Sequence, residues 1–131
     1  MIHGDLHHHN FILSGNELTL IDFGDSEYHW FAYDIAVAIY HVAQAEQMRP
    51  DRQEFIKSFF NSFMSGYSRG NSVTEFISQI DYFIDYRHLF SYTYHSLYSD
   101  KSQLTEQQLK YLDEMRLSLI KESSFLGFSL L

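Results

Sequence analysis

The residues with the clearest chemical potential lie in two short stretches near the start of the chain. The first runs from His3 to Asn10 and contains Asp5, and the second, residues 21–25, contains Asp22. Transfer of a phosphoryl group from a nucleotide needs a carboxylate that accepts the proton of the attacking hydroxyl, and oxygen ligands that hold Mg²⁺ against the phosphates. Asp5, Asn10 and Asp22 are of the types that this reaction needs.

The spacing of these residues allows them to meet around one metal ion. Four residues separate Asp5 from Asn10, so the two can lie at opposite ends of one loop, the carboxylate facing the acceptor and the amide oxygen facing the metal. Two short β-type runs, 11–13 and 18–21, are joined by a Ser-Gly-Asn-Glu sequence typical of a hairpin turn. Such a hairpin would bring Asp22 to the far side of the same metal.

Three ordered motif blocks carry a family resemblance. They are His3-Gly4-Asp5-Leu6-His7 with Asn10, then Ile21-Asp22-Phe23-Gly24-Asp25, then Phe31-Ala32-Tyr33-Asp34-Ile35-Ala36. In order and spacing they resemble the aminoglycoside phosphotransferase and choline kinase superfamily, which includes homoserine kinase-like members. The resemblance implies the C-terminal lobe of a kinase-like fold and an ATP- or GTP-dependent, Mg²⁺-requiring phosphotransferase that acts on a hydroxyl of a small molecule.

The resemblance also implies roles for single residues. Asp5 matches the catalytic base, and Asn10 and Asp22 match the Mg²⁺ ligands. His3 matches the structural histidine of the loop. Asp34 matches a buried aspartate that accepts hydrogen bonds from backbone amides of that loop, which is a supporting role.

His7 and Asp25, which lie within the motif blocks, are expected to have supporting roles at most. Within the His7-His8-His9 run, His7 matches the family motif and the other two fill the loop. Zinc is the competing interpretation, but three consecutive side chains cannot easily converge on one ion, and the chain has no Cys to complete a site. Asp25 is interpreted as a carboxylate that is either solvated or in contact with a residue that holds the metal.

The acceptor cleft is harder to locate from sequence. Asp81 and Asp85, one helical turn apart, are candidates for its polar wall, although a solvated helix face explains them equally well. A run of aromatic residues could line the cleft, but we expect most of them to pack in the core. The run consists of Tyr82, Phe83, Tyr86, Phe90, Tyr92, Tyr94 and Tyr98.

Composition limits the class of protein. The 131 residues, 45% of them hydrophobic, predict a single domain over residues 1–131, and the absence of Cys fits a cytoplasmic protein. No segment approaches the roughly 20 apolar residues of a membrane span. The net charge of −8 argues against a nucleic-acid partner and is compatible with a cationic acceptor.

Periodicity predicts an α+β, mainly α fold, in which about four helices follow the loop and the hairpin. The segment after Phe31 is apolar nearly all round, as in a buried helix. Residues 51–67 place four aromatic side chains at steps of four on one face. Possible capping boxes at residues 72–75 and 105–108 predict helices over 72–98 and 105–121.

Enzymes of this family also need an N-terminal lobe that clamps the nucleotide phosphates, and no glycine-rich loop with a strand Lys is recognisable in this sequence. We therefore expect the isolated chain to be inactive, either as a truncated half of a two-lobe kinase or beside another chain. The alternatives are a non-catalytic binding or dimerisation module and a Ser/Thr protein kinase. Apolar surface on the hairpin predicts a homodimer.

Overall fold

The computed structural model describes all residues from Met1 to Leu131. The chain forms a hairpin of β1 (Phe11–Ser14) and β2 (Glu17–Leu20), followed by α1 (Phe31–Ala45), α2 (Arg52–Tyr67), α3 (Ile80–Tyr98) and α4 (Glu106–Ile120). This mainly helical α+β arrangement is the fold class that the sequence predicts. None of the helices is long and apolar enough to cross a lipid bilayer.

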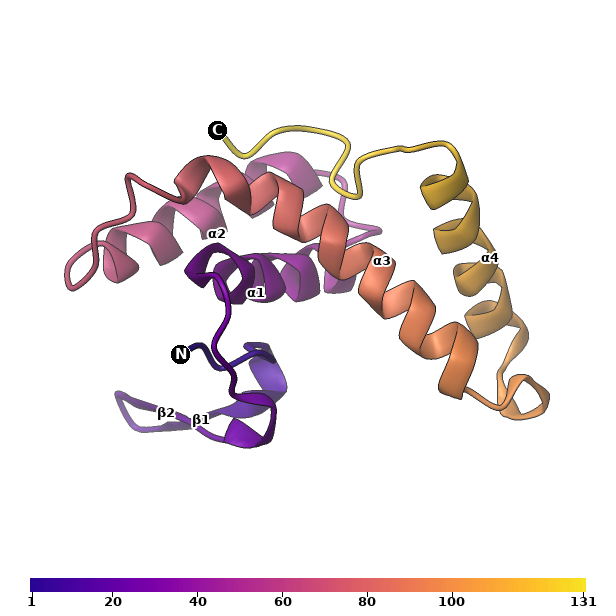
Figure 1. Ribbon diagram of the computed structural model, residues 1–131, viewed down its shortest axis with the longest axis horizontal. Helices are drawn as coiled ribbons and strands as arrows, with labels where there is room; N and C mark the ends of the chain where they lie inside the picture. Colours follow the sequence, from indigo (N-terminus) through magenta and orange to yellow (C-terminus); the bar gives the residue numbers. More distant parts are fainter.

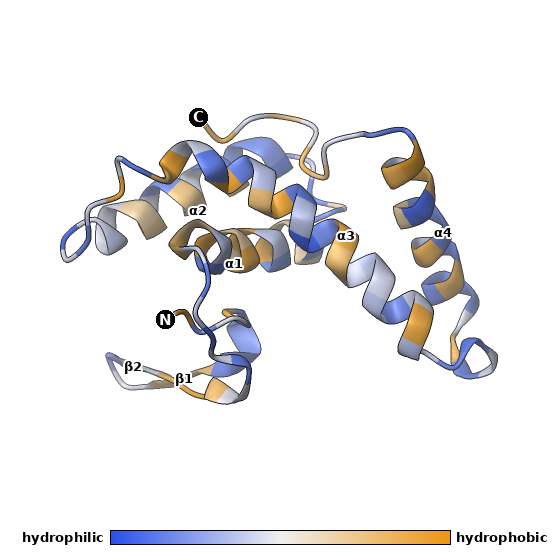
Figure 2. Cartoon of the chain, viewed as in Figure 1, coloured by the Kyte–Doolittle hydropathy of each residue, from blue (hydrophilic) through white to orange (hydrophobic).

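Helix α1 is the centre of the core. Nearly every residue from Ala32 to Ala43 is buried, which explains why its sequence is apolar all round. α3 crosses over α1, and α2 lies alongside (Figure 1), so that Ile56 of α2 and Ile84 of α3 join the same apolar cluster. Coloured by hydropathy, α1 is the most continuously apolar of the helices (Figure 2).

The hairpin lies apart from the helices, at the end of the molecule away from α4 (Figure 1). Its strands pair antiparallel from Phe11 with Leu20 to Ser14 with Glu17. Leu13 and Leu18 are cross-strand partners and remain 71% and 63% exposed. The loop from His3 to Asn10, hereafter the His3–Asn10 loop, precedes this hairpin, and residues 21–30 connect the hairpin to α1.

In α2, the aromatic stripe predicted from the sequence and the buried face are offset by one residue. The predicted stripe is only partly buried, whereas the residues one position further on face the core. The partly buried set is Phe55, Phe59, Phe63 and Tyr67, and the buried set is Ile56, Phe60 and Met64. The apolar face is therefore wider than the stripe alone indicates.

The capping box predicted at Ser72 is wrong, whereas the one at Thr105 is confirmed. Thr105 accepts a hydrogen bond from the Gln108 amide at 3.2 Å, and the Gln108 side chain accepts one from the Thr105 amide at 2.8 Å. Residues 73–76 instead form a turn, and α3 begins at Ile80 without a side-chain cap. The turn packs Val73 and Phe76 against the core, which outweighs a surface cap.

The C-terminal segment runs back over α3 and α2 (Figure 1). Asp85 accepts a hydrogen bond from the Phe125 amide at 2.8 Å, and Asp81 accepts from the Leu130 amide at 3.3 Å. Arg52 donates to the Leu126 carbonyl at 3.0 Å. The carboxylates of Asp81 and Asp85 thus hold this segment, and neither contacts the His3–Asn10 loop, where an acceptor-cleft residue would be expected.

Candidate active site

The His3–Asn10 loop depends on a glycine at position 4. Gly4 has a φ of +86°, and a Cβ added there would lie 2.3 Å from the carbonyl oxygen of Asp25. Ile2 pairs with Glu27 through a 2.8 Å backbone hydrogen bond, so the start of the loop runs beside residues 25–27. Only glycine combines this φ with so close an approach of two backbones.

Asp34 holds the loop from the first turn of α1. Its two carboxylate oxygens accept hydrogen bonds from the backbone amides of His3 and Gly4, each at 3.0 Å. Both bonds are charge-assisted, and together they fix the two residues that precede Asp5. α1 thereby positions a loop that lies 30 residues earlier in the chain.

His3 connects this loop to the segment that carries Asp22. Its Nδ1 accepts a 3.3 Å hydrogen bond from the Asp5 amide, so the ring proton lies on Nε2 and is donated to the Ile21 carbonyl at 2.9 Å. The ring is buried, with 5% exposure. Asp22 follows directly in the left-handed conformation, with φ +61°. This conformation is costly for a non-glycine residue and is commonly found at functional sites.

Asp5 is the most heavily contacted carboxylate of the site. His7 Nε2 lies 3.0 Å from its Oδ2, and Arg87 Nη2 lies 3.0 Å from its Oδ1. The other ring nitrogen of His7 accepts from the His9 amide at 3.1 Å, which leaves the Nε2 proton to be donated to Asp5. The Asp5 side chain is 26% exposed, so it is accessible to a small molecule.

Asn10 is buried beside Asp5, with 6% exposure. Its amide nitrogen donates to the backbone carbonyl of Asp5 at 2.9 Å and lies 3.4 Å from the Asp5 carboxylate. This orientation leaves Oδ1 of Asn10 without a protein hydrogen bond. An amide oxygen and the carboxylate of Asp22 are suitable ligands for a hard divalent cation. No group of three or more His, Cys, Asp or Glu side chains is arranged to hold a metal.

The sequence analysis missed Arg87, Tyr33 and His41. Arg87 lies on α3 and donates to the Tyr33 hydroxyl at 3.2 Å as well as to Asp5, and it contacts His41 Nε2 at 3.2 Å. One signal was present, because Arg87 is the single Lys or Arg between Arg69 and Lys101. A single basic residue on a largely aromatic helix is a candidate partner for a buried carboxylate.

The aromatic residues of α3 are mostly exposed, contrary to the predicted packing. Five of them, spaced by four, are each at least 41% exposed, while Phe83 is buried. The ring of Phe90 lies 5.2 Å from the guanidinium carbon of Arg87, so this stripe passes close to Asp5. The five residues are Tyr82, Tyr86, Phe90, Tyr94 and Tyr98.

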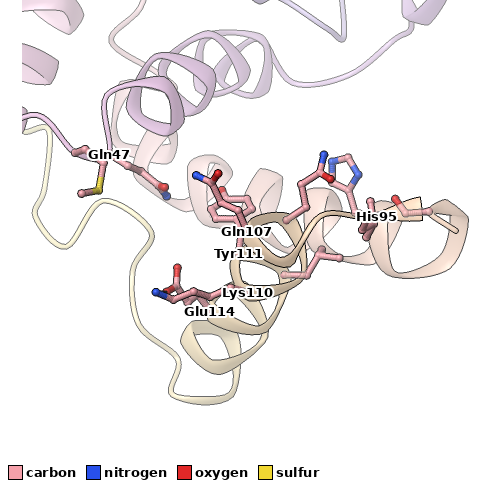
Figure 3. Close-up of a pocket in the computed structure, with 11 residues that line it drawn as sticks. Gln47, His95, Gln107, Lys110, Tyr111 and Glu114 are labelled. Atoms are coloured by element: carbon pink, nitrogen blue, oxygen red, sulfur yellow. The ribbon is translucent and has the colours of Figure 1, made fainter. Parts of the chain in front are cut away.

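A separate pocket of about 530 Å³ lies between the C-terminal half of α3 and α4 (Figure 3). Gln47, His95 and Tyr111 are among the residues that line it. Tyr111 also accepts a 2.9 Å hydrogen bond from Gln44 of α1. None of the residues that the motifs single out lines this pocket.

Comparisons with known proteins give consistent results. A family model described as "Phosphotransferase enzyme family" matches residues 1–70. Amicoumacin kinase from Bacillus subtilis (strain 168) is 30% identical over 118 residues, which make up 88% of this chain and 35% of that protein. The EKC/KEOPS complex subunit BUD32 from Debaryomyces hansenii is 35% identical over 79 residues, or 60% of this chain and 30% of that protein.

A solved structure agrees over almost the whole chain. Amicoumacin kinase hAmiN, in complex with AMP-PNP, Ca²⁺ and Ami, matches with a TM-score of 0.86 and 29% sequence identity. The match covers 98% of this chain and 39% of that chain. This chain spans about a third of the length of the curated relatives that it matches.

Proposed function

We propose that the protein carrying this chain transfers the γ-phosphoryl group of a nucleotide to a hydroxyl of a small molecule. The chain belongs to the phosphotransferase enzyme family, as its motif blocks predicted. One observation above all supports the proposal. The amide nitrogen of Asn10 is bonded to Asp5, which leaves an amide oxygen for a metal beside the carboxylate of the proposed base.

In this proposal Asp5 accepts the proton of the attacking hydroxyl. Its carboxylate receives hydrogen bonds from His7 and Arg87. An ionised carboxylate can accept about four hydrogen bonds, so room is left for the acceptor hydroxyl. His7 orients the base through Oδ2, and Asp34 and His3 hold the backbone on which the base sits.

Asn10 Oδ1 and a carboxylate oxygen of Asp22 are the proposed Mg²⁺ ligands. When bound, the ion would supply positive charge that offsets the negative charge developing during transfer. Two protein ligands suffice, because Mg²⁺ usually keeps several waters and phosphate oxygens. Asp25 contributes its backbone carbonyl beside Gly4, and a role for its side chain stays a prediction.

The donor and the first acceptor to test follow from the relatives. AMP-PNP in the hAmiN complex favours ATP over GTP as the donor. Amicoumacin is the first acceptor to test, because both a curated relative and a structural neighbour are amicoumacin kinases.

The test uses the full-length protein that carries this chain. Purified protein is incubated with Mg·ATP and amicoumacin, and transfer of the γ-phosphate is followed with radiolabelled nucleotide. Wild type is expected to transfer phosphate, and Asp5→Ala to lose nearly all activity while binding Mg·ATP as tightly in calorimetry. Asp113→Ala, which removes an exposed carboxylate paired with Arg116 on α4, is the matched control and should be fully active.

Two outcomes would overturn parts of this proposal. Full activity of Asp5→Ala would remove Asp5 as the base. Failure of the full-length protein to bind Mg·ATP at all would favour the competing function, a non-catalytic binding module. Asn10→Ala and Asp22→Ala should raise the Mg²⁺ concentration needed for half-maximal activity, and an unchanged requirement would exclude them as ligands.

A further inference from the structure

Arg87 reaches the proposed base from a different part of the fold. It lies on α3, and its Nη2 is 3.0 Å from Oδ1 of Asp5, 82 residues away in sequence. Its side chain is only 11% exposed. A hydrogen bond between guanidinium and carboxylate is charge-assisted, and partial burial lowers the screening by water. Arg87 is outside all three motif blocks.

The guanidinium is itself held in place from several sides. Nη1 donates to the Tyr33 hydroxyl at 3.2 Å, and Nη2 is 3.2 Å from His41 Nε2. Burial, together with the positive charge of Arg87, lowers the pKa of His41 to about 4. His41 is therefore neutral near pH 7, and its Nε2 can accept a hydrogen bond from the guanidinium. Tyr33 and His41 both belong to α1, so the arginine is fixed against the central helix.

We propose that Arg87 is a positioning residue that fixes the carboxylate of Asp5 for phosphoryl transfer, an inference that rests on the function proposed above. Arg87 holds Oδ1 while His7 holds Oδ2, so the carboxylate plane is fixed at both oxygens. Without Arg87, Oδ1 has no protein partner, and the carboxylate is held through Oδ2 alone. Small errors in the placement of a base are costly because transfer needs near-attack geometry.

The contact is not needed to attach α3 to the core. The helix already packs against α1 through buried side chains that include Ile80, Phe83 and Ile84. A residue that is dispensable for packing but bonded to the base should affect turnover more than folding.

The experiment measures steady-state kinetics of the full-length protein with Mg·ATP and amicoumacin. Arg87→Met, which keeps side-chain length without charge, is expected to lower kcat by about 100-fold. The KM for ATP should change by less than about twofold, because the interaction acts on the base and not on nucleotide binding. Arg87→Lys should recover part of the rate, since an ammonium can reach Oδ1 but cannot bond Tyr33 in the same fork geometry. Arg116→Met, on the exposed face of α4, is the control and should keep the wild-type rate.

A double-mutant comparison separates positioning from a general structural role. If Arg87 acts through Asp5, adding Arg87→Met to Asp5→Ala should cause no further loss of residual activity. An additional loss in that background, or a wild-type kcat for Arg87→Met, would overturn the inference. Should Arg87→Met fail to fold, Arg87→Gln carries the same test, and a wild-type kcat for that variant has the same meaning.

The two proposals fail in different ways. If Asp5→Ala remains active, the proposed function is wrong and the role of Arg87 falls with it. If Asp5→Ala is inactive while Arg87→Met is fully active, only the positioning role is refuted.

Discussion

The hydrogen bonds of Asp34 to the His3–Asn10 loop lead to a quantitative prediction. In Asp34→Ala, the amides of His3 and Gly4 both lose a carboxylate acceptor at 3.0 Å. Asp34→Asn keeps one acceptor oxygen but places an NH₂ group against the second amide. The two variants therefore remove different shares of the same interaction.

The expected cost can be worked out from these contacts. A hydrogen bond to a charged group contributes about 1.5–3 kcal/mol, so losing two bonds would cost about 3–6 kcal/mol in a closed interior. Asp34 is only partly buried, so water can replace part of the interaction, and we expect about 3 kcal/mol for Asp34→Ala and about half of that for Asp34→Asn. The loop can open without unfolding the helices, so the effect should be largely local.

Amide hydrogen exchange followed by NMR is the appropriate assay. A loss of about 3 kcal/mol corresponds to roughly 100-fold faster exchange of the His3 and Gly4 amides through local opening. Amides in the middle of α1 should change far less. Asp25→Asn, whose exposed side chain makes no hydrogen bond, is the matched control. Unchanged exchange of both loop amides in Asp34→Ala would refute the reasoning.

Three further predictions concern stability and association. Burial lowers the pKa of His41 to about 4, so below pH 6.5 the unfolded chain binds more protons than the folded chain. Urea unfolding should therefore show about 1–2 kcal/mol less stability at pH 5 than at pH 7.5. The variant His41→Gln should reduce this loss. Gly4→Ala should be destabilised by at least about 2 kcal/mol in the same assay, because its Cβ would lie 2.3 Å from the Asp25 carbonyl oxygen and its φ is +86°. Gly15→Ala has open space around its Cβ and should lose less stability. The purified chain should sediment as a dimer, and Leu13→Asp in the exposed hairpin should return it to monomer; a wild-type monomer at high concentration would contradict this.

The contact between Asp34 and the loop was predictable because the ordered motif blocks resemble a known family. The bonds from loop amides to Asp34, which the resemblance implied, are present in the structure. Arg87 was not predictable in this way. Its contact with Asp5 depends on how α3 crosses α1, which is a tertiary property that no local spacing encodes.

The two capping boxes illustrate the same limit. The Ser72 and Thr105 sequences carry similar local signals, yet only the second begins a helix. At the first box Val73 and Phe76 pack against the core as partly buried side chains, whereas α4 is largely surface-exposed and its cap meets no competing interaction.

The imidazole of His3 has a mechanical consequence for the proposed site. One ring nitrogen bonds the amide of Asp5, and the other bonds the carbonyl of Ile21, next to Asp22. A planar ring cannot stretch, so a displacement on one side is passed directly to the other. The proposed base Asp5 and the proposed Mg²⁺ ligand Asp22 therefore share one spacer, and a change at His3 should disturb both positions at once.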